Sequence, residues 1–231
     1  MTVPGVRVLR GKPVVAALLS FNGGFVDTAG FLGLEGLFTA HVTGNFVTLG
    51  AALVFGTHGV IAKLLALPEF IIMVALVHAA GAVLRARALP ALRILLIAKV
   101  LLLLAFFALA VLLGPFPTSD APAALLTGFA GIAAMAIQNA VQRVHFASLP
   151  PSTIMTGNTT QAVLDAVDLI RGVKTEEAAA LRARFRRTLG AIVYFAGGCG
   201  MAAALYFWIG FWCLAVPVAV GAASAIMRIE E

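Results

Sequence analysis

Charged side chains are scarce in this sequence. They make up 11% of its 231 residues, whereas hydrophobic residues make up 61%. A soluble domain has about a quarter charged residues and about half apolar ones, so an ordinary water-soluble enzyme is excluded. The net charge of +6 sits on a chain with little polar surface. This balance also excludes a disordered chain and a nucleic-acid-binding protein, and no nucleic-acid partner is expected.

Cysteines and the common catalytic motifs are also lacking. The two cysteines, Cys199 and Cys213, lie in apolar stretches, and their spacing fits neither a metal site nor a disulfide framework. The chain has no Gly-x-Ser-x-Gly elbow, no His-Glu-x-x-His pair and no P-loop lysine. We therefore expect no enzyme, no metal and no cofactor.

What the sequence does contain is a series of long apolar stretches. A membrane-spanning helix needs about 20 apolar residues, so the chain has room for roughly six to eight of them. A two-residue alternation of polar and apolar side chains is absent, which favours helices over strands. The apolar stretches cover residues 14–34, 39–55, 64–88, 92–113, 123–146, 153–169, 188–205 and 207–225. The sequence predicts an all-α polytopic membrane protein with a single transmembrane domain, residues 1–231.

One tripeptide occurs twice and indicates an internal repeat. Thr43-Gly44-Asn45 recurs 113 residues later as Thr156-Gly157-Asn158. Each copy lies between a polar stretch and two plain apolar stretches, and Asp27 before the first copy corresponds to Asn139 before the second. This self-similarity predicts two repeats, residues 14–113 and 123–227.

The basic residues predict how these repeats cross the membrane. Lysine and arginine concentrate in short cytoplasmic loops, and here they gather before residue 14, at Arg85, Arg87 and Arg93, and in the polar run 171–187. With these segments on the cytoplasmic side, the apolar stretch that contains each Thr-Gly-Asn and the stretch before it must together cross the membrane an odd number of times. We therefore expect a broken or re-entrant helix there, about three crossings in each half, inverted halves, and cytoplasmic termini. Eight full spans in parallel repeats would place Arg87 outside, against the charge rule.

The Thr-Gly-Asn breaks are the candidate binding site. Thr43 and Thr156 are expected to cap helix N-termini and to leave free N–H groups near the membrane midplane. Such ends carry partial positive charge and favour an anionic or carbonyl-bearing ligand. The alternative is that these small and amide residues only let helices pack closely.

Asp27 is the most informative single residue, because a charge inside the bilayer costs several kcal/mol. It is expected to be either a proton- or cation-coupling carboxylate or one half of a structural ion pair with Arg143. Lys99 is expected to extend its ammonium group to the inner membrane surface. The residues expected to bind the substrate are Asp27, Thr43, Gly44, Asn45, Gln138, Asn139, Arg143, Thr156, Gly157 and Asn158.

Four sequence blocks carry a resemblance to a known family. They are Gly24-x-x-Asp27, Phe-Thr-Ala-His-Val-Thr-Gly-Asn at 38–45, Gln-Asn at 138–139 and Met-Thr-Gly-Asn at 155–158. The chain resembles the YoaK-type family, a domain-of-unknown-function family of bacterial inner-membrane proteins. The resemblance covers nearly the whole chain. It implies a multi-pass protein of the bacterial cytoplasmic membrane, sometimes labelled a permease, and it implies no substrate.

The function expected first is a small secondary transporter or channel. It would work by alternating access between the two halves. The expected partners are the lipid bilayer and an unidentified small solute, and an anionic solute and a homodimer with a second copy of the chain are left open. One alternative is a non-transporting scaffold, sensor subunit or lipid-binding protein. Another is an intramembrane enzyme acting on lipid, which requires Glu35, His41 and Asp27 to converge. The basic run 182–187 is expected either to bind anionic headgroups or only to enforce the topology.

Overall fold

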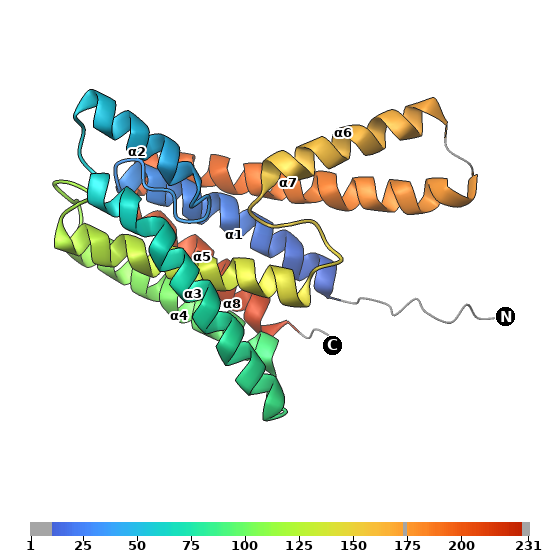
Figure 1. Cartoon of the computed structure of the whole chain (residues 1–231), viewed down its shortest axis with the longest axis horizontal. Helices are drawn as coiled ribbons and strands as arrows, with labels where there is room; N and C mark the ends of the chain where they lie inside the picture. The colour runs from blue at the N-terminus through green and yellow to red at the C-terminus, as the bar shows by residue number, and fades with distance from the viewer. Residues whose placement is uncertain (1–10, 173–174, 228–231) are drawn as a thin grey trace.

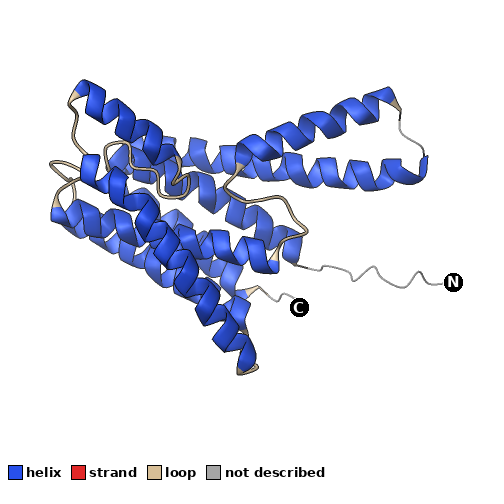
Figure 2. Ribbon diagram, viewed as in Figure 1, coloured by secondary structure: helices blue, strands red, loops and turns tan. Residues whose placement is uncertain are grey.

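The computed structural model describes residues 11–172 and 175–227, and within these ranges the regular structure is helical, without strands (Figure 2). Arg7, Arg10 and Lys174 of the predicted basic clusters lie outside the described residues. The helices are α1 (Lys12–Gly33), α2 (Gly44–Phe55), α3 (Val60–Ala86), α4 (Ala91–Leu113), α5 (Pro122–His145), α6 (Met155–Arg171), α7 (Thr175–Ile209), the 3-10 helix η1 (Gly210–Leu214) and α8 (Ala215–Ile226).

Five helical stretches are long and apolar enough to cross a membrane. They are α1, α3, α4, α5 and the continuous stretch 177–226, which contains most of α7 and all of η1 and α8. The side chains of α3 are mostly exposed, including Ile71, Ile72 and Leu76, each between 57% and 59% exposed. Apolar side chains exposed to this degree belong in contact with lipid, so the prediction of an all-helical, multi-pass membrane protein is confirmed.

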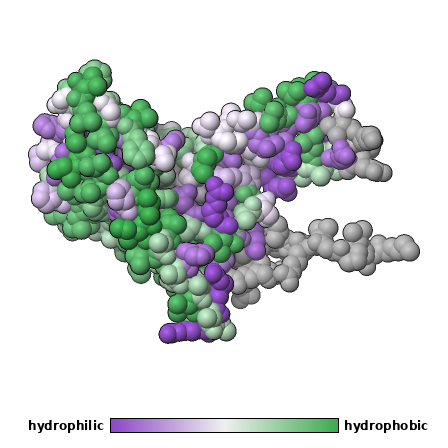
Figure 3. Space-filling view, viewed as in Figure 1, coloured by the Kyte–Doolittle hydropathy of each residue, from purple (hydrophilic) through white to green (hydrophobic). Residues whose placement is uncertain are grey.

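The helix ends gather at two opposite ends of the molecule. Figure 1 shows the start of α1, the α3–α4 turn, the α6–α7 hairpin and the end of α8 toward one end. The α2–α3 and α4–α5 connections and η1 lie at the other end. Residues 34–43 and 146–154 are irregular and turn back beside the bundle before α2 and α6 begin. Hydrophilic side chains gather over the α6–α7 hairpin and at the α3–α4 tip (Figure 3).

The polar run 171–187 does not form the loop that the sequence predicted. α6 continues to Arg171, and α7 already begins at Thr175. Ala178 to Arg187 contains alanine, leucine and arginine, which favour helix more than most residues do, so the chain reverses within only a few residues. At 1.5 Å per residue the 35 residues of α7 measure about 52 Å, well beyond the roughly 30 Å hydrocarbon core.

The helices α1 and α7 pack with their backbones in direct contact. A Cβ atom on Gly24 would collide with the carbonyl oxygen of Phe195, and one on Gly198 would collide with that of Phe21. The thiol of Cys199 also donates a 3.5 Å hydrogen bond to the carbonyl oxygen of Gly24. Small residues allow such close approach between membrane helices. This contact fixes α7, and therefore the basic part of α7, against α1.

Candidate functional site

The first Thr-Gly-Asn sequence holds the irregular segment 34–43 in place. Asn45 is 1% exposed. Its side-chain amide donates to the carbonyl oxygen of Phe38 at 2.8 Å and accepts from the N–H of Phe38 at 2.9 Å. Both backbone groups of Phe38 are thereby satisfied without water, as irregular backbone at membrane depth requires.

Asp27 holds the same segment from the other side. Its carboxylate accepts the N–H groups of Ala40 at 2.7 Å and His41 at 3.2 Å. The expected ion pair with Arg143 is wrong, because Arg143 is exposed at the end of α5 and has no ion-pair partner among the described residues. A carboxylate that accepts two backbone N–H groups has a structural role; its proposed coupling role stays a prediction.

The second Thr-Gly-Asn sequence makes a related set of contacts. Asn158 donates to the carbonyl oxygen of Pro151 at 2.8 Å. Pro151 lies seven residues before Asn158, the same separation as between Phe38 and Asn45. Asn139 accepts the hydroxyl hydrogen of Thr153 at 2.6 Å. Gln138 donates to Leu19 O at 2.7 Å and to the hydroxyl oxygen of Ser152 at 3.1 Å. These bonds fasten the segment 146–154 to α5 and α6, and Gln138 also joins α5 to α1.

The expected capping by the two threonines is not found. Thr43 precedes α2 but its side chain makes no capping bond, and Thr156 already lies inside α6. The N–H groups of Gly44, Asn45 and Phe46 donate to the carbonyl oxygens of residues 41–43. The prediction of free N–H groups at the start of α2 is therefore wrong, because the preceding turn uses them.

A cavity of about 380 Å³ opens beside the second break. We call it the cationic cavity, because three arginines and no acidic residue line it. It lies between the end of α5, the segment 146–154, the first turns of α6 and the middle of α7. Its lining residues are Arg143, Ala147, Ser148, Leu149, Pro150, Pro151, Ile154, Gly157, Asn158, Gln161, Arg184, Arg187 and Thr188.

One of the three arginines is neutralised. Arg184 donates to the carboxylate of Asp165 from Nη2 at 2.6 Å and from Nε at 3.0 and 3.2 Å. These bonds hold the pKa of Asp165 below its usual range, against the opposing effect of burial, and Gln161 adds a further hydrogen bond to the same carboxylate. Arg143 and Arg187 have no acidic partner among the described residues. The cavity therefore keeps a net positive charge.

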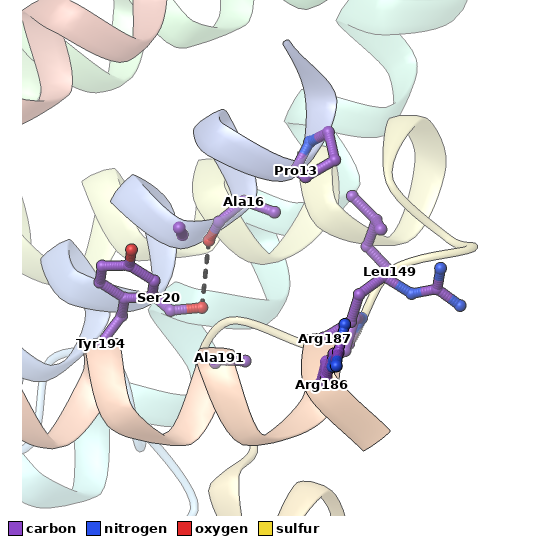
Figure 4. A pocket seen from close by; sticks show the side chains of 11 residues that line it. Pro13, Ala16, Ser20, Leu149, Arg186, Arg187, Ala191 and Tyr194 are labelled. Atoms are coloured by element: carbon purple, nitrogen blue, oxygen red, sulfur yellow. Dashed lines mark hydrogen bonds between the residues drawn. The ribbon is translucent and has the colours of Figure 1, made fainter. Parts of the chain in front are cut away.

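An apolar groove adjoins this cavity. It has a volume of about 160 Å³ and lies between α1 and α7; we call it the α1–α7 groove. Pro13, Ala16, Ala191 and Tyr194 line it, with Arg186 and Arg187 at one end (Figure 4). Leu149, Pro150 and Arg187 line both spaces.

Only part of the predicted site lies in the cationic cavity. Arg143, Gly157 and Asn158 line it. The other predicted site residues do not line the cavity, and most of them fasten irregular segments instead. They are Asp27, Thr43, Gly44, Asn45, Gln138, Asn139 and Thr156. Sequence reasoning did not assign Arg184, Arg187 or Thr188 to the site. The available signal was the basic run 182–187, since arginines that immediately precede an apolar span lie at headgroup depth.

Lys99 is not at the membrane surface, and this prediction is wrong. It is fully buried on α4, and its ammonium group has no hydrogen-bond partner in the described part of the chain. The side chain points between packed helices, because α4 presents this face to α5 and α8.

Replacing Lys99 with methionine is expected to stabilise the protein. The apolar side chain removes an unpaired buried ammonium, a gain of about 1–3 kcal/mol. Lys63→Met is the matched control, because Lys63 is also buried but donates to His58 O at 3.2 Å; this variant is expected to lose stability. Thermal unfolding in detergent measures both, and a lower unfolding midpoint for Lys99→Met contradicts the prediction.

The Arg184–Asp165 pair predicts an acid-sensitive hairpin. Because the folded-state pKa of Asp165 is lowered, the pair stabilises the α6–α7 contact at neutral pH and is lost as the pH falls through that lowered pKa. Asp165→Asn is expected to cost about 1 kcal/mol and to flatten this pH dependence. Hydrogen exchange of α6 measures it. The exposed Asp168 provides the control variant Asp168→Asn, and an equal effect of both substitutions contradicts the prediction.

One comparison with known proteins gives a match. A family model described as a protein of unknown function (DUF1275) matches residues 15–227, which is nearly the whole chain and agrees with the YoaK-type resemblance. No curated protein and no solved structure matches.

Proposed function

For this chain, which belongs to the DUF1275 family of proteins of unknown function, we propose the role of a secondary transporter or channel for a small anionic solute. The cationic cavity is its solute site. The chain works in the bacterial cytoplasmic membrane, with its termini and the α6–α7 hairpin on the cytoplasmic side, where basic residues are favoured.

The observation that carries this proposal is the charge of the cationic cavity. Arg143 and Arg187 lack acidic partners among the described residues, and Ser148 adds a hydroxyl donor. Thr188 and Gln161 also line the cavity, but the Thr188 hydroxyl donates to Arg184 O and Gln161 donates one N–H to Asp165. Arginine and hydroxyl groups together suit an oxyanion, because a guanidinium group donates two parallel hydrogen bonds to it. Asp165 neutralises Arg184 and so leaves two free cations for the solute.

Inverted halves are part of the proposal. Their support is the correspondence between the two breaks: Asn45 bonds to residue 38 and Asn158 to residue 151, in each case seven residues earlier. Thr39 bonds to Val26 O at 3.2 Å, and Ser152, at the matching position, bonds to Gln138. In each half the irregular segment turns back beside the bundle before the next helix begins, as one net crossing of the first two helices would require (Figure 1). This arrangement suits alternating access around a fixed site.

Arg143→Gln and Arg187→Gln are expected to weaken anion binding at least tenfold. Each removes one of the two free cations, and neither removes an ion pair. Inorganic phosphate and sulfate are the probes, with binding measured by thermal shift and uptake measured in proteoliposomes. Arg182→Gln is the control, because Arg182 is exposed on the same helix and does not line the cavity.

Two outcomes count against the proposed function. Anion binding that is unchanged in Arg143→Gln and Arg187→Gln removes the cavity as its site. Binding without uptake removes transport and leaves the chain as an anion-binding membrane protein.

A further inference from the structure

We propose that the ligand of the cationic cavity is an anionic lipid, with its phosphate in the cavity and an acyl chain in the α1–α7 groove. This inference rests on the proposed function, because it names the chemical class of the solute for the same site. It follows from the depth of the cavity, from its continuity with the groove and from the charges of both.

The cavity lies at the depth of lipid phosphates. The apolar part of α7, residues 189–209, begins two residues after Arg187. At 1.5 Å per residue these residues measure about 31 Å, which matches the roughly 30 Å hydrocarbon core. Arg184 and Arg187 therefore lie where the core ends and the headgroups begin.

The groove continues from the cavity toward the core. Arg187, Leu149 and Pro150 border both spaces. Beyond them the groove follows α7 through Gly190, Ala191 and Tyr194, inside the apolar part of the helix, and its other wall is Ala16 and Ala17 of α1 (Figure 4). Most of the lining between the two helices is small and apolar, which suits a hydrocarbon chain. The Ser20 hydroxyl, which also lines the groove, already donates to the carbonyl oxygen of Ala16 at 3.1 Å.

The charges select an anionic headgroup. No acidic side chain lines either space, and Arg143, Arg186 and Arg187 stand at the junction or in the cavity. A zwitterionic headgroup would bring its own cation next to these guanidinium groups, whereas a phosphate with no amine meets only donors. A free phosphate satisfies the arginines but leaves the apolar groove without a ligand group.

Gly190 allows the groove to be blocked without disturbing the fold. It lines the groove, and a Cβ atom added there meets no atom within 4 Å. Gly190→Leu is therefore expected to occupy part of the groove while its Cβ atom meets no backbone. Gly197→Leu is the matched control, because a Cβ there also meets nothing within 4 Å and Gly197 does not line the groove.

The test compares three probes on the purified full chain in detergent: dioctanoyl phosphatidic acid, inorganic phosphate and dioctanoyl phosphatidylcholine. The expected result is that the phosphatidic acid binds at least tenfold more tightly than the other two. Arg187→Gln is expected to weaken the binding of both phosphatidic acid and phosphate at least tenfold, and so to abolish the preference over phosphatidylcholine. Gly190→Leu is expected to weaken phosphatidic acid binding at least tenfold and to leave phosphate binding unchanged, while Gly197→Leu changes neither.

The outcomes separate this inference from the proposed function. If phosphate and phosphatidic acid bind with equal affinity and Gly190→Leu changes neither affinity, the proposal of a lipid ligand is overturned and the proposal of an anion site stands. If phosphatidic acid binds in Gly190→Leu as in the unmodified chain, the groove assignment is overturned. If the binding of phosphate and of phosphatidic acid is unchanged in Arg143→Gln and in Arg187→Gln, the cationic cavity is not the binding site, and both proposals fail.

Discussion

Gly24→Leu is expected to destroy the packing of α1 against α7. Any Cβ on Gly24 collides with the carbonyl oxygen of Phe195, a backbone atom, and lies 3.0 Å from the thiol of Cys199. A backbone atom of a helix cannot rotate away as a side chain can, so the two helices must separate. Overpacking usually costs about 1–3 kcal/mol and occasionally more; here we expect a loss of about 4 kcal/mol or more, or no folded protein.

The measurement is the fraction of monodisperse protein in detergent and its unfolding temperature. Gly197→Leu introduces the same side chain into the helix opposite and meets nothing within 4 Å, so it is expected to behave nearly as the unmodified chain does. Equal behaviour of the two variants would show that α1 and α7 are not in backbone contact.

Asn45→Ala is expected to release the segment 34–43. The substitution leaves both the N–H and the carbonyl group of Phe38 without their partner. A buried backbone group that loses its hydrogen bond costs about 1–3 kcal/mol, so the expected loss is about 2–5 kcal/mol. Limited proteolysis of this segment and thermal unfolding both detect it.

Asn158→Ala is the internal comparison for this prediction. Asn158 donates to the carbonyl oxygen of Pro151 at 2.8 Å and to the thioether sulfur of Met155 at 3.6 Å. It accepts no N–H from residue 151, since a proline has none to offer. Its substitution is therefore expected to cost about half as much as that of Asn45. A larger loss for Asn158→Ala than for Asn45→Ala would show that these amides do not act through the two backbone segments.

The sequence predicts the membrane class because this class depends on composition alone. It overestimates the number of spans: roughly six to eight were expected, and five helical stretches of the described residues are long and apolar enough to cross a membrane. It also marks Asn45 and Asn158 through their recurrence. It does not reveal their partners, since a side chain that reaches seven residues back follows from the path of an irregular loop and not from a periodic pattern. The sequence also predicts free N–H groups at the start of α2, near Gly44, and this is wrong. The turn at residues 41–43, whose carbonyl oxygens accept these N–H groups, has no sequence signal of its own.

The cationic cavity was out of reach of sequence reasoning for a different reason. Arg143 and Arg187 are 44 residues apart in the chain and meet only because α7 packs beside α1 and the segment 146–154. The burial of Lys99 likewise depends on the helices that surround α4, and a lysine within an apolar stretch fits either a surface or an interior position.

The length of α7 has a mechanical consequence. One unbroken helix carries Gly198, which is clamped to α1, and Arg187, which borders both the cavity and the groove. With Gly198 as pivot, Arg187 is about 16 Å along the axis and the far end of the helix about 34 Å. A tilt that shifts the N-terminal end of α7 by about 4 Å therefore shifts Arg187 by about 2 Å, enough to break a hydrogen bond of its guanidinium group. A displacement of the end of α7 is thus transmitted to Arg187, and so to both spaces that it borders, at about half its amplitude.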